Sequence, residues 1–189
     1  MKYGFLSDQR PSPPVGNGVR VFAPSSKHAD ATLFASAPNS ASRGEFEGYA
    51  SVFGVMDLGR DVVMPGAFRE SLDRRGPKGV KLLWQHDPGL PVGIWTSIEE
   101  DQRGLFVRGA LDLEQSKSRE ILSLMRQGAL DGLSIGYRTE LERKDPETGL
   151  RRLERIDLWE ISLVTFPLLP QARVQSVKSR PSAAELARP

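Results

Sequence analysis

The chain of 189 residues contains no cysteine and only two histidines, so few side chains are available for acid–base or nucleophilic chemistry. Without cysteine it forms neither disulfides nor thiolates, which fits a reducing cytoplasm. The lack of a Cys/His cluster disfavours zinc, and we expect neither a metal nor a cofactor. No window approaches the ~18 consecutive apolar residues of a membrane span. Residues 1–8 lack the apolar core of a secretory signal.

Positive charge is in slight excess and belongs to the ends of the chain. The net charge is +2 and the pI is about 9.0. Residues 1–43 hold five Lys/Arg against two Asp (+3), and residues 178–189 hold three against one Glu (+2). Residues 44–177 hold 18 basic and 21 acidic side chains (−3). Because a nucleic-acid-binding domain carries its basic residues on the folded surface, nucleic acid is disfavoured as a partner.

Composition divides the chain into three parts. Residues 1–43 are rich in Pro, Ser, Ala, Gly and Asn without a sustained period, so we expect a disordered or weakly ordered N-terminal extension, with a short extended piece at 19–22. Residues 178–189 are expected to form a flexible C-terminal tail. Between them, residues 44–177 have the size of one ordinary domain.

Strand patterns dominate this domain. Alternating or apolar segments predict strands at 45–53, 80–85, 92–98, 105–111, 133–141 and 150–166. Polar turns at 99–104 and 144–149 predict two hairpins. Helices are predicted at 65–74, with Pro65 in the first turn, and at 114–127, ending at Gly128. The expected fold is α+β, with a β-rich, barrel-like core and flanking helices.

A histidine and a glycine-flanked serine are the first candidates for chemistry. His86 follows an apolar segment, and we expect the turn of residues 87–89 to hold its ring at a barrel rim. Ser134 lies in the pattern Gly132-x-Ser134-x-Gly136. Such residues are parts of a serine hydrolase. An α/β-hydrolase is excluded because its histidine must follow the serine. The alternatives are a hydrogen-bonded histidine at a strand end and a serine bonded to backbone at a strand start.

Glu160 is the third candidate, because it interrupts the apolar segment 158–164. An unpaired carboxylate on a buried face costs much free energy, so this group needs a partner. The N–H of His86 is one candidate and would fix the tautomer of the ring. Arg138 or Arg155 is the competing candidate and would form a structural ion pair instead.

The three candidate residues occur together with several longer segments that match one known protein family. The matching segments are Gly48–Phe53, Asp61–Phe68, Leu83–Asp87, Gly132–Tyr137 and Trp159–Pro167. In them, and in their order from about residue 44 to 177, the chain resembles the caudovirus prohead maturation proteases. The fold of these proteases is like that of the herpesvirus assemblin proteases.

The resemblance implies a role for each candidate. His86 is the general base, Ser134 the nucleophile and Glu160 the acid that orients the histidine. Assemblins have a second histidine in the third place, so the carboxylate departs from their pattern while suiting the phage branch. Asp61 and Asp157 stay open as alternative third members. The loop after Pro167 also differs from the family pattern of a small residue, Asn and Pro.

The resemblance also implies a substrate and a place of action. The chain would be a serine endopeptidase that cleaves scaffold or capsid-protein precursor segments, and itself, during prohead maturation. It would act inside the immature capsid in the host or bacterial cytoplasm, neither secreted nor on a membrane. Whether it forms a homo-oligomer is left open. The alternative is a non-catalytic, scaffold-associated capsid assembly protein with the same fold.

Overall fold

The structure, a computed structural model, describes residues 44–178. The expected extension 1–43, with its extended piece at 19–22, and residues 179–189 of the expected tail 178–189 lie outside these residues. Within the described part, eight strands and two helices follow one another along the chain. Their bounds are β1 Glu45–Val52, β2 Asp61–Val63, α1 Arg69–Gly79, β3 Lys81–Trp84, β4 Asp87–Glu100, β5 Gly104–Leu111, α2 Ser116–Arg126, β6 Gly132–Lys144, β7 Arg151–Val164 and β8 Val174–Val177.

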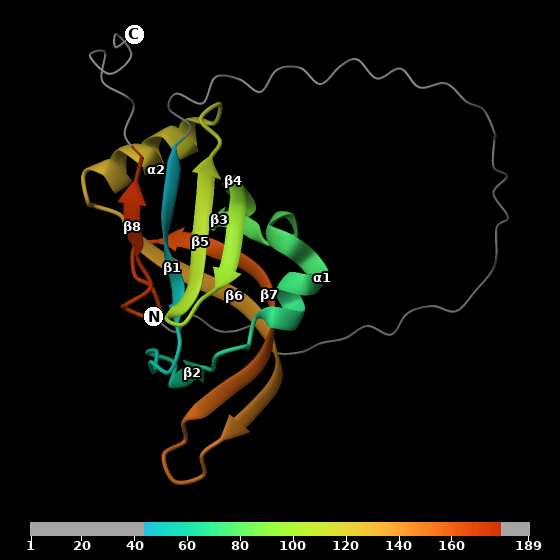
Figure 1. The fold of residues 1–189 in the computed structure, drawn as a ribbon. Coiled ribbons are helices and arrows are strands. Elements are labelled where there is room, and N and C mark those ends of the chain that lie inside the picture. Colours follow the sequence, from blue (N-terminus) through green and yellow to red (C-terminus); the bar gives the residue numbers. More distant parts are fainter. Residues whose placement is uncertain (1–43, 179–189) are drawn as a thin grey trace, which may run out of the picture. The chain divides into compact units, whose positions relative to one another are not determined.

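All eight strands join in one mixed sheet of order β2-β7-β3-β4-β5-β1-β8, in which β6 also pairs with β7 (Figure 1). Strand β7 pairs with three other strands, antiparallel with β6 and parallel with both β2 and β3. A bridge between Gly132 and Arg173 connects the start of β6 to the segment before β8. The sheet therefore curls toward itself, and the expected α+β class with a barrel-like core is confirmed.

The hydrophobic core is built from apolar side chains of the strands and of the two helices. The largest fully buried side chains are Trp95, Phe46, Phe68, Leu82, Leu105, Ile121, Leu133, Leu153, Ile156, Leu158, Ile161 and Leu163. Phe46 and Trp95 meet edge to face with ring centroids 5.6 Å apart. Gly109 lies against both rings, because a Cβ there would come within 2.9 Å of each.

Helix α2 lies close to its expected position and buries one face. Its buried residues are Ser118, Ile121, Leu122 and Met125, the i, i+3, i+4, i+7 spacing of an amphipathic helix. Gly128 follows with a φ of 72°, the left-handed conformation that ends many helices. The prediction for this helix is confirmed to within two residues at each end.

Helix α1 corrects the prediction that a helix begins at Pro65. Residues 65–68 form a turn, and the helix starts at Arg69. Gly66 has a φ of 89°, which no right-handed helix contains. The helix also runs further than expected, to Gly79, with a break at Gly76 (φ 60°) before Pro77.

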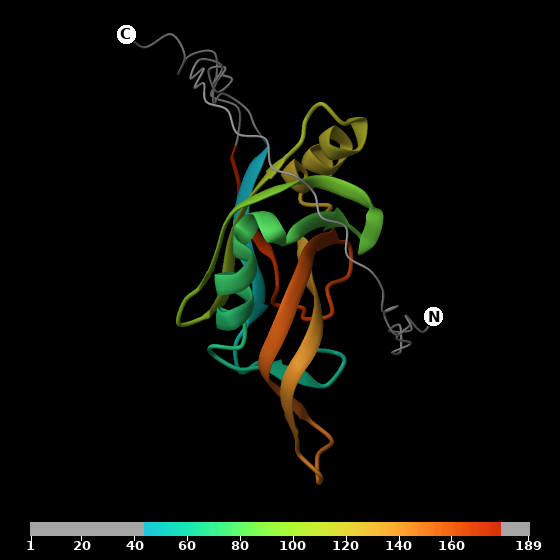
Figure 2. The ribbon, with the colours of Figure 1, turned by 90° about the vertical axis from the view of Figure 1, so that its right-hand side faces the viewer.

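The hairpin of β6 and β7 reaches beyond the rest of the sheet in both views (Figure 1, Figure 2). The near part of the same hairpin lies within the sheet, where β3 joins β7 at residues 160–163. It is this near part that carries Ser134 and Glu160. Neither helix of residues 44–178 has the length and apolarity to cross a lipid bilayer.

Candidate active site

His86 lies in a two-residue turn between β3 and β4. Trp84 pairs with Asp87, and the two residues between them have φ values of 53° (Gln85) and 60° (His86). Tight hairpins take this conformation because its twist matches that of the strands, although Asn and Gly adopt it at lower cost. The expected turn at residues 87–89 is therefore wrong, because these residues begin β4.

Strand β7 and Thr165, which follows it, hold this turn in place through three hydrogen bonds. The backbone N–H of Gln85 donates to the carbonyl of Leu163 at 3.0 Å. The Gln85 side-chain amide donates to Oγ1 of Thr165 at 2.8 Å. The backbone N–H of His86 donates to Oγ of Ser162 at 3.0 Å. These bonds offset the cost of two non-glycine residues with positive φ, so the position of the histidine is set by β7.

The ring of His86 faces the carboxylate of Glu160. Nδ1 lies 2.6 Å from Oε1, and the other carboxylate oxygen accepts a 2.6 Å hydrogen bond from the hydroxyl of Ser162. A carboxylate only accepts hydrogen bonds, so the proton of a neutral His86 ring belongs on Nδ1. Nε2 then carries the lone pair, which is the tautomer that a general base requires. The Glu160 side chain is 13 % exposed and that of His86 43 %.

Ser134 shares a sheet face with Glu160. In the β6–β7 register, Ser134 is directly opposite Ser162, and Gly136 is directly opposite Glu160. Directly opposed residues of an antiparallel pair point to the same side with Cβ atoms about 5 Å apart. Ser134 is 8 % exposed. The register thus brings the serine and the glutamate together on one face, beside the hydroxyl that bonds the backbone of His86.

Both glycines of the Gly-x-Ser-x-Gly pattern are sites of close approach. A Cβ on Gly136 would lie 2.0 Å from Oε1 of Glu160, so the missing side chain makes the space that the carboxylate occupies. A Cβ on Gly132 would lie 2.4 Å from the carbonyl oxygen of Val164 and 2.9 Å from Cδ of Pro167. The pattern is therefore a strand start with two close contacts, and it lacks the strand–turn–helix of a nucleophile elbow.

The other candidate acids are engaged elsewhere. Asp61 accepts hydrogen bonds from Arg151 (Nε, 2.7 Å) and from the hydroxyl of Tyr137 (3.1 Å). Asp157 accepts two from Arg75 at 3.0 and 2.9 Å, and these bonds hold the pKa of its carboxyl well below the usual range. Burial raises the pKa of Tyr137, so its hydroxyl keeps the proton that it donates. Of the three acids, the structure brings Glu160 to the histidine.

The two arginines proposed as competing partners of Glu160 pair with other acids. Arg138 lies 3.6 Å from Asp157, and Arg155 lies 3.4 Å from Glu140. Asp157 and Glu140 thus belong to an ion-pair cluster on the α1 side of the hairpin. The cluster supports the packing of α1 on β7 and takes no part in the arrangement around His86.

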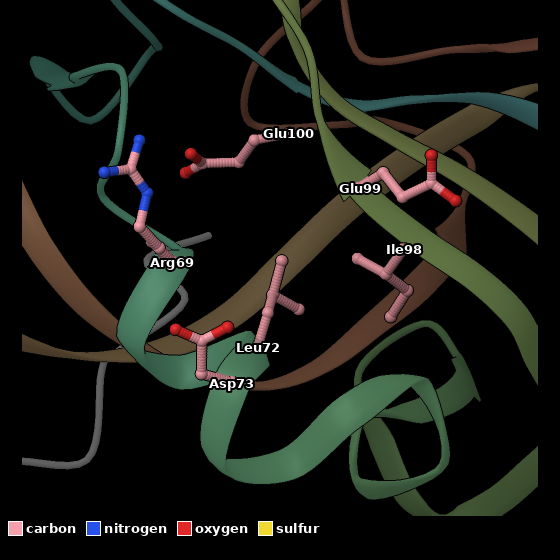
Figure 3. Close-up of a pocket in the computed structure, with 6 residues that line it drawn as sticks. All are labelled: Arg69, Leu72, Asp73, Ile98, Glu99 and Glu100. Carbon is pink, nitrogen blue, oxygen red and sulfur yellow. The ribbon is translucent and has the colours of Figure 1, made fainter.

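A pocket of about 390 Å³ lies between α1 and the end of β4 (Figure 3). It is lined by Arg69, Leu72, Asp73, Ile98, Glu99 and Glu100. Glu100 accepts a 2.8 Å hydrogen bond from the backbone N–H of Phe68 and so holds the start of α1. None of the three candidate residues lines this pocket.

Ser162 was missed by sequence reasoning. It is fully buried and contacts both His86 and Glu160. The signal was available, because Ser162 follows Glu160 by two residues and therefore points to the same face of the strand. A lone serine in an apolar strand is nonetheless common, and its meaning depends on the register with β3 and β6.

Comparison with known proteins places this geometry in context. The family model described as caudovirus prohead serine protease matches residues 32–186. The prohead protease of Enterobacteria phage HK97 is 39% identical over 142 residues, which are 72% of this chain and 61% of that protein. The capsid polyprotein of Pseudomonas phage PAJU2 is 31% identical over 130 residues, 65% of this chain and 18% of the polyprotein. The chain thus spans less than two thirds of either relative.

Two solved structures are similar in fold. The KSHV protease, in complex with a hexapeptide phosphonate inhibitor, has a TM-score of 0.51 at 14% identity, over 69% of this chain and 63% of that one. The bacteriophage T4 capsid assembly protease has a TM-score of 0.51 at 13% identity, over 69% and 93%. At such identities the likeness shows the fold alone, and it is the fold expected from the sequence.

Proposed function

Because the chain belongs to the caudovirus prohead serine protease family, we propose that it is a serine endopeptidase of capsid maturation in which Ser134, His86 and Glu160 form the catalytic triad. The observation that carries the proposal is the 2.6 Å contact between Nδ1 of His86 and Glu160, on the sheet face that also bears Ser134. A carboxylate, an imidazole and a hydroxyl in this order make a nucleophile from an otherwise weak serine.

The proposed reaction depends on the tautomer of His86 in which Nδ1 carries the proton and Nε2 the lone pair. Nε2 of His86 takes the proton of Ser134 as Oγ attacks the scissile carbonyl carbon, and the imidazolium is stabilised by Glu160. The same proton then passes from Nε2 to the leaving amine as the peptide C–N bond breaks. Water, deprotonated by Nε2, hydrolyses the acyl-enzyme and returns Ser134. Backbone N–H groups would stabilise the oxyanion, a contribution typically worth about 3 kcal/mol.

We propose segments of the capsid-protein precursor or its scaffold as the substrates, together with the chain itself. This is supported by one relative's name, capsid polyprotein, and by that of the structural neighbour from T4, a capsid assembly protease. The place of action would then be the interior of the immature shell in the host cytoplasm. The tails at 1–43 and 178–189, polar in sequence, would be the first sites of self-cleavage.

The second candidate is a non-catalytic capsid assembly protein with the same fold. It would need neither an oriented imidazole nor a serine beside it. The ordered contact of His86 with Glu160 therefore favours the protease, because holding a half-exposed histidine in a positive-φ turn has no evident structural benefit.

The test is intact-mass spectrometry over time on the purified chain and on Ser134→Ala, alone and with the capsid-protein precursor. The protease predicts fragments in wild type that are absent in the variant. Labelling by a fluorophosphonate, which reacts with activated serines, reports the nucleophile without a known substrate. A wild-type chain that cleaves nothing and takes no label at Ser134 would favour the assembly protein.

A further inference from the structure

The hydroxyl of Ser162 is hydrogen-bonded to two of the proposed triad members, and its residue pairs with the third across β6 and β7. It is 3.0 Å from the backbone nitrogen of His86 and 2.6 Å from Oε2 of Glu160. It is also directly opposite Ser134 in the β6–β7 register. The side chain is fully buried, so both hydrogen bonds are protected from exchange with water.

The direction of each hydrogen bond follows from the groups involved. The backbone N–H of His86 can only donate, so the oxygen of Ser162 accepts there. Its single hydrogen is then free to point at Oε2 of Glu160, which can only accept. The ring N–H of His86 donates to Oε1 of the same carboxylate. Backbone, hydroxyl, carboxylate and ring thus form one closed cycle of hydrogen bonds.

This cycle constrains two flexible parts at once. His86 lies in a turn without glycine or asparagine, and a turn of this kind needs outside contacts to keep its shape. Glu160 has three side-chain torsions, and one oxygen alone would leave its carboxylate free to rotate. By binding the backbone of His86 and the second oxygen of Glu160, Ser162 fixes the distance between turn and carboxylate.

We propose that Ser162 is a positioning residue, which holds His86 in the Nδ1–H tautomer through Glu160 and through the turn backbone. Its catalytic consequence rests on the proposed function. A hydroxyl that merely fills the core would contribute to stability and leave the tautomer unchanged. The matched control is Ser118, also fully buried and hydrogen-bonded, to the carbonyl of Val92 at 2.8 Å, on helix α2.

The chain allows a direct spectroscopic test because it has only two histidines. In a His28→Gln background, ¹⁵N-labelled histidine reports His86 alone, and the two ring-nitrogen shifts give the tautomer. In the neutral ring, we expect the proton to be on Nδ1. Ser162→Ala should give a mixture of both tautomers, whereas Ser118→Ala should keep the spectrum of the parent.

The rate of fluorophosphonate labelling at Ser134 gives the second readout. We expect Ser162→Ala to slow it about tenfold to hundredfold, the range for a lost hydrogen bond to a charged group, and Ser118→Ala to change it less than about threefold. An unchanged tautomer and rate in folded Ser162→Ala would overturn the proposal. A tautomer change in a chain that never labels would support positioning by Ser162 and refute the protease.

Discussion

Replacing Gly136 with alanine tests whether this glycine makes room for the carboxylate of Glu160. The added Cβ would lie 2.0 Å from Oε1 and 2.7 Å from Cδ, whereas ordinary contact begins at 3.4 Å. The oxygen must therefore retreat by about 1.4 Å, or the side chain must take another rotamer. Either change lengthens or bends the 2.6 Å hydrogen bond to His86, and N–H···O bonds are usually no longer than about 3.2 Å and weaken steeply when bent below about 120°.

The magnitude follows from the role proposed for Glu160 as the orienting acid. Its complete loss in a triad costs roughly 10⁴ in rate, so a displaced but present carboxylate should cost roughly 10²–10³. We expect fluorophosphonate labelling of Ser134 to slow by that factor in Gly136→Ala. The crowding itself should lower the free energy of unfolding by about 1–3 kcal/mol, as measured by urea titration.

The matched control is Gly109→Ala, in strand β5. Its Cβ would meet Phe46 at 2.8 Å and Trp95 at 2.9 Å, so it crowds the core, less closely than at Gly136, without touching the proposed triad. It should lose similar stability and label within about threefold of the wild-type rate. If folded Gly136→Ala labels as fast as this control, the space over Gly136 is not needed and the reasoning fails.

Three further expectations follow from other contacts. Glu160→Gln keeps the side-chain volume, yet should slow labelling roughly 10²–10⁴-fold with the fold intact, and a far-UV spectrum unlike that of wild type would undermine the test. Asp157→Asn should lower the free energy of unfolding by about 3 kcal/mol at neutral pH. Because the pKa of Asp157 is depressed in the folded chain, this difference should be complete above about pH 4 and be lost progressively as the pH falls from there through the depressed folded pKa, and a pH-independent difference would contradict the ion pair. Leu153→Ala, at a fully buried site of β7, should cost about 2–5 kcal/mol in urea titration, and a loss below about 1 kcal/mol would contradict the packing described.

Most of the strands could be predicted from sequence because their residues alternate or are continuously apolar. The hairpins around 99–104 and 144–149 and helix α2 were located to within a few residues, since their turn chemistry and their apolar periodicity agree with the tertiary structure. The class of fold followed from these elements. The pairing of β7 with β2 and β3 could not be predicted, because parallel partners are distant in sequence and no turn between them indicates the pairing.

Strands β2 and β8 were not predicted, and two of the wrong predictions have local causes. Pro65 is well suited to a helix start, but Gly66 takes a left-handed conformation and delays the helix to Arg69. The residues Gln85 and His86 are poor turn formers, whereas Asp87-Pro88-Gly89 is a strong turn signal. The tertiary hydrogen bonds from β7 outweigh that preference and place the turn at the histidine.

The candidate site could be found in part because the chain has so few histidines and no cysteine. His86, Ser134 and Glu160 were named from residue type, order and resemblance, and they remain a proposal. Their mutual geometry depends on register, which the sequence does not display. For the same reason the space over Gly136 and the contacts of Ser162 emerged only from the structure.

Strand β7 has a consequence for when the proposed active site can form during synthesis. A growing chain that ends before residue 151 already contains His86 and Ser134. It contains neither Glu160 nor Ser162, and the turn at His86 has no Leu163 carbonyl to bind. Hydrolysis by this site would therefore begin only after β7 has been made and has docked between β3 and β6. Unfinished chains on the ribosome would be unable to cleave neighbouring proteins. The formation of β7, the last long strand, would be the step that completes the proposed site.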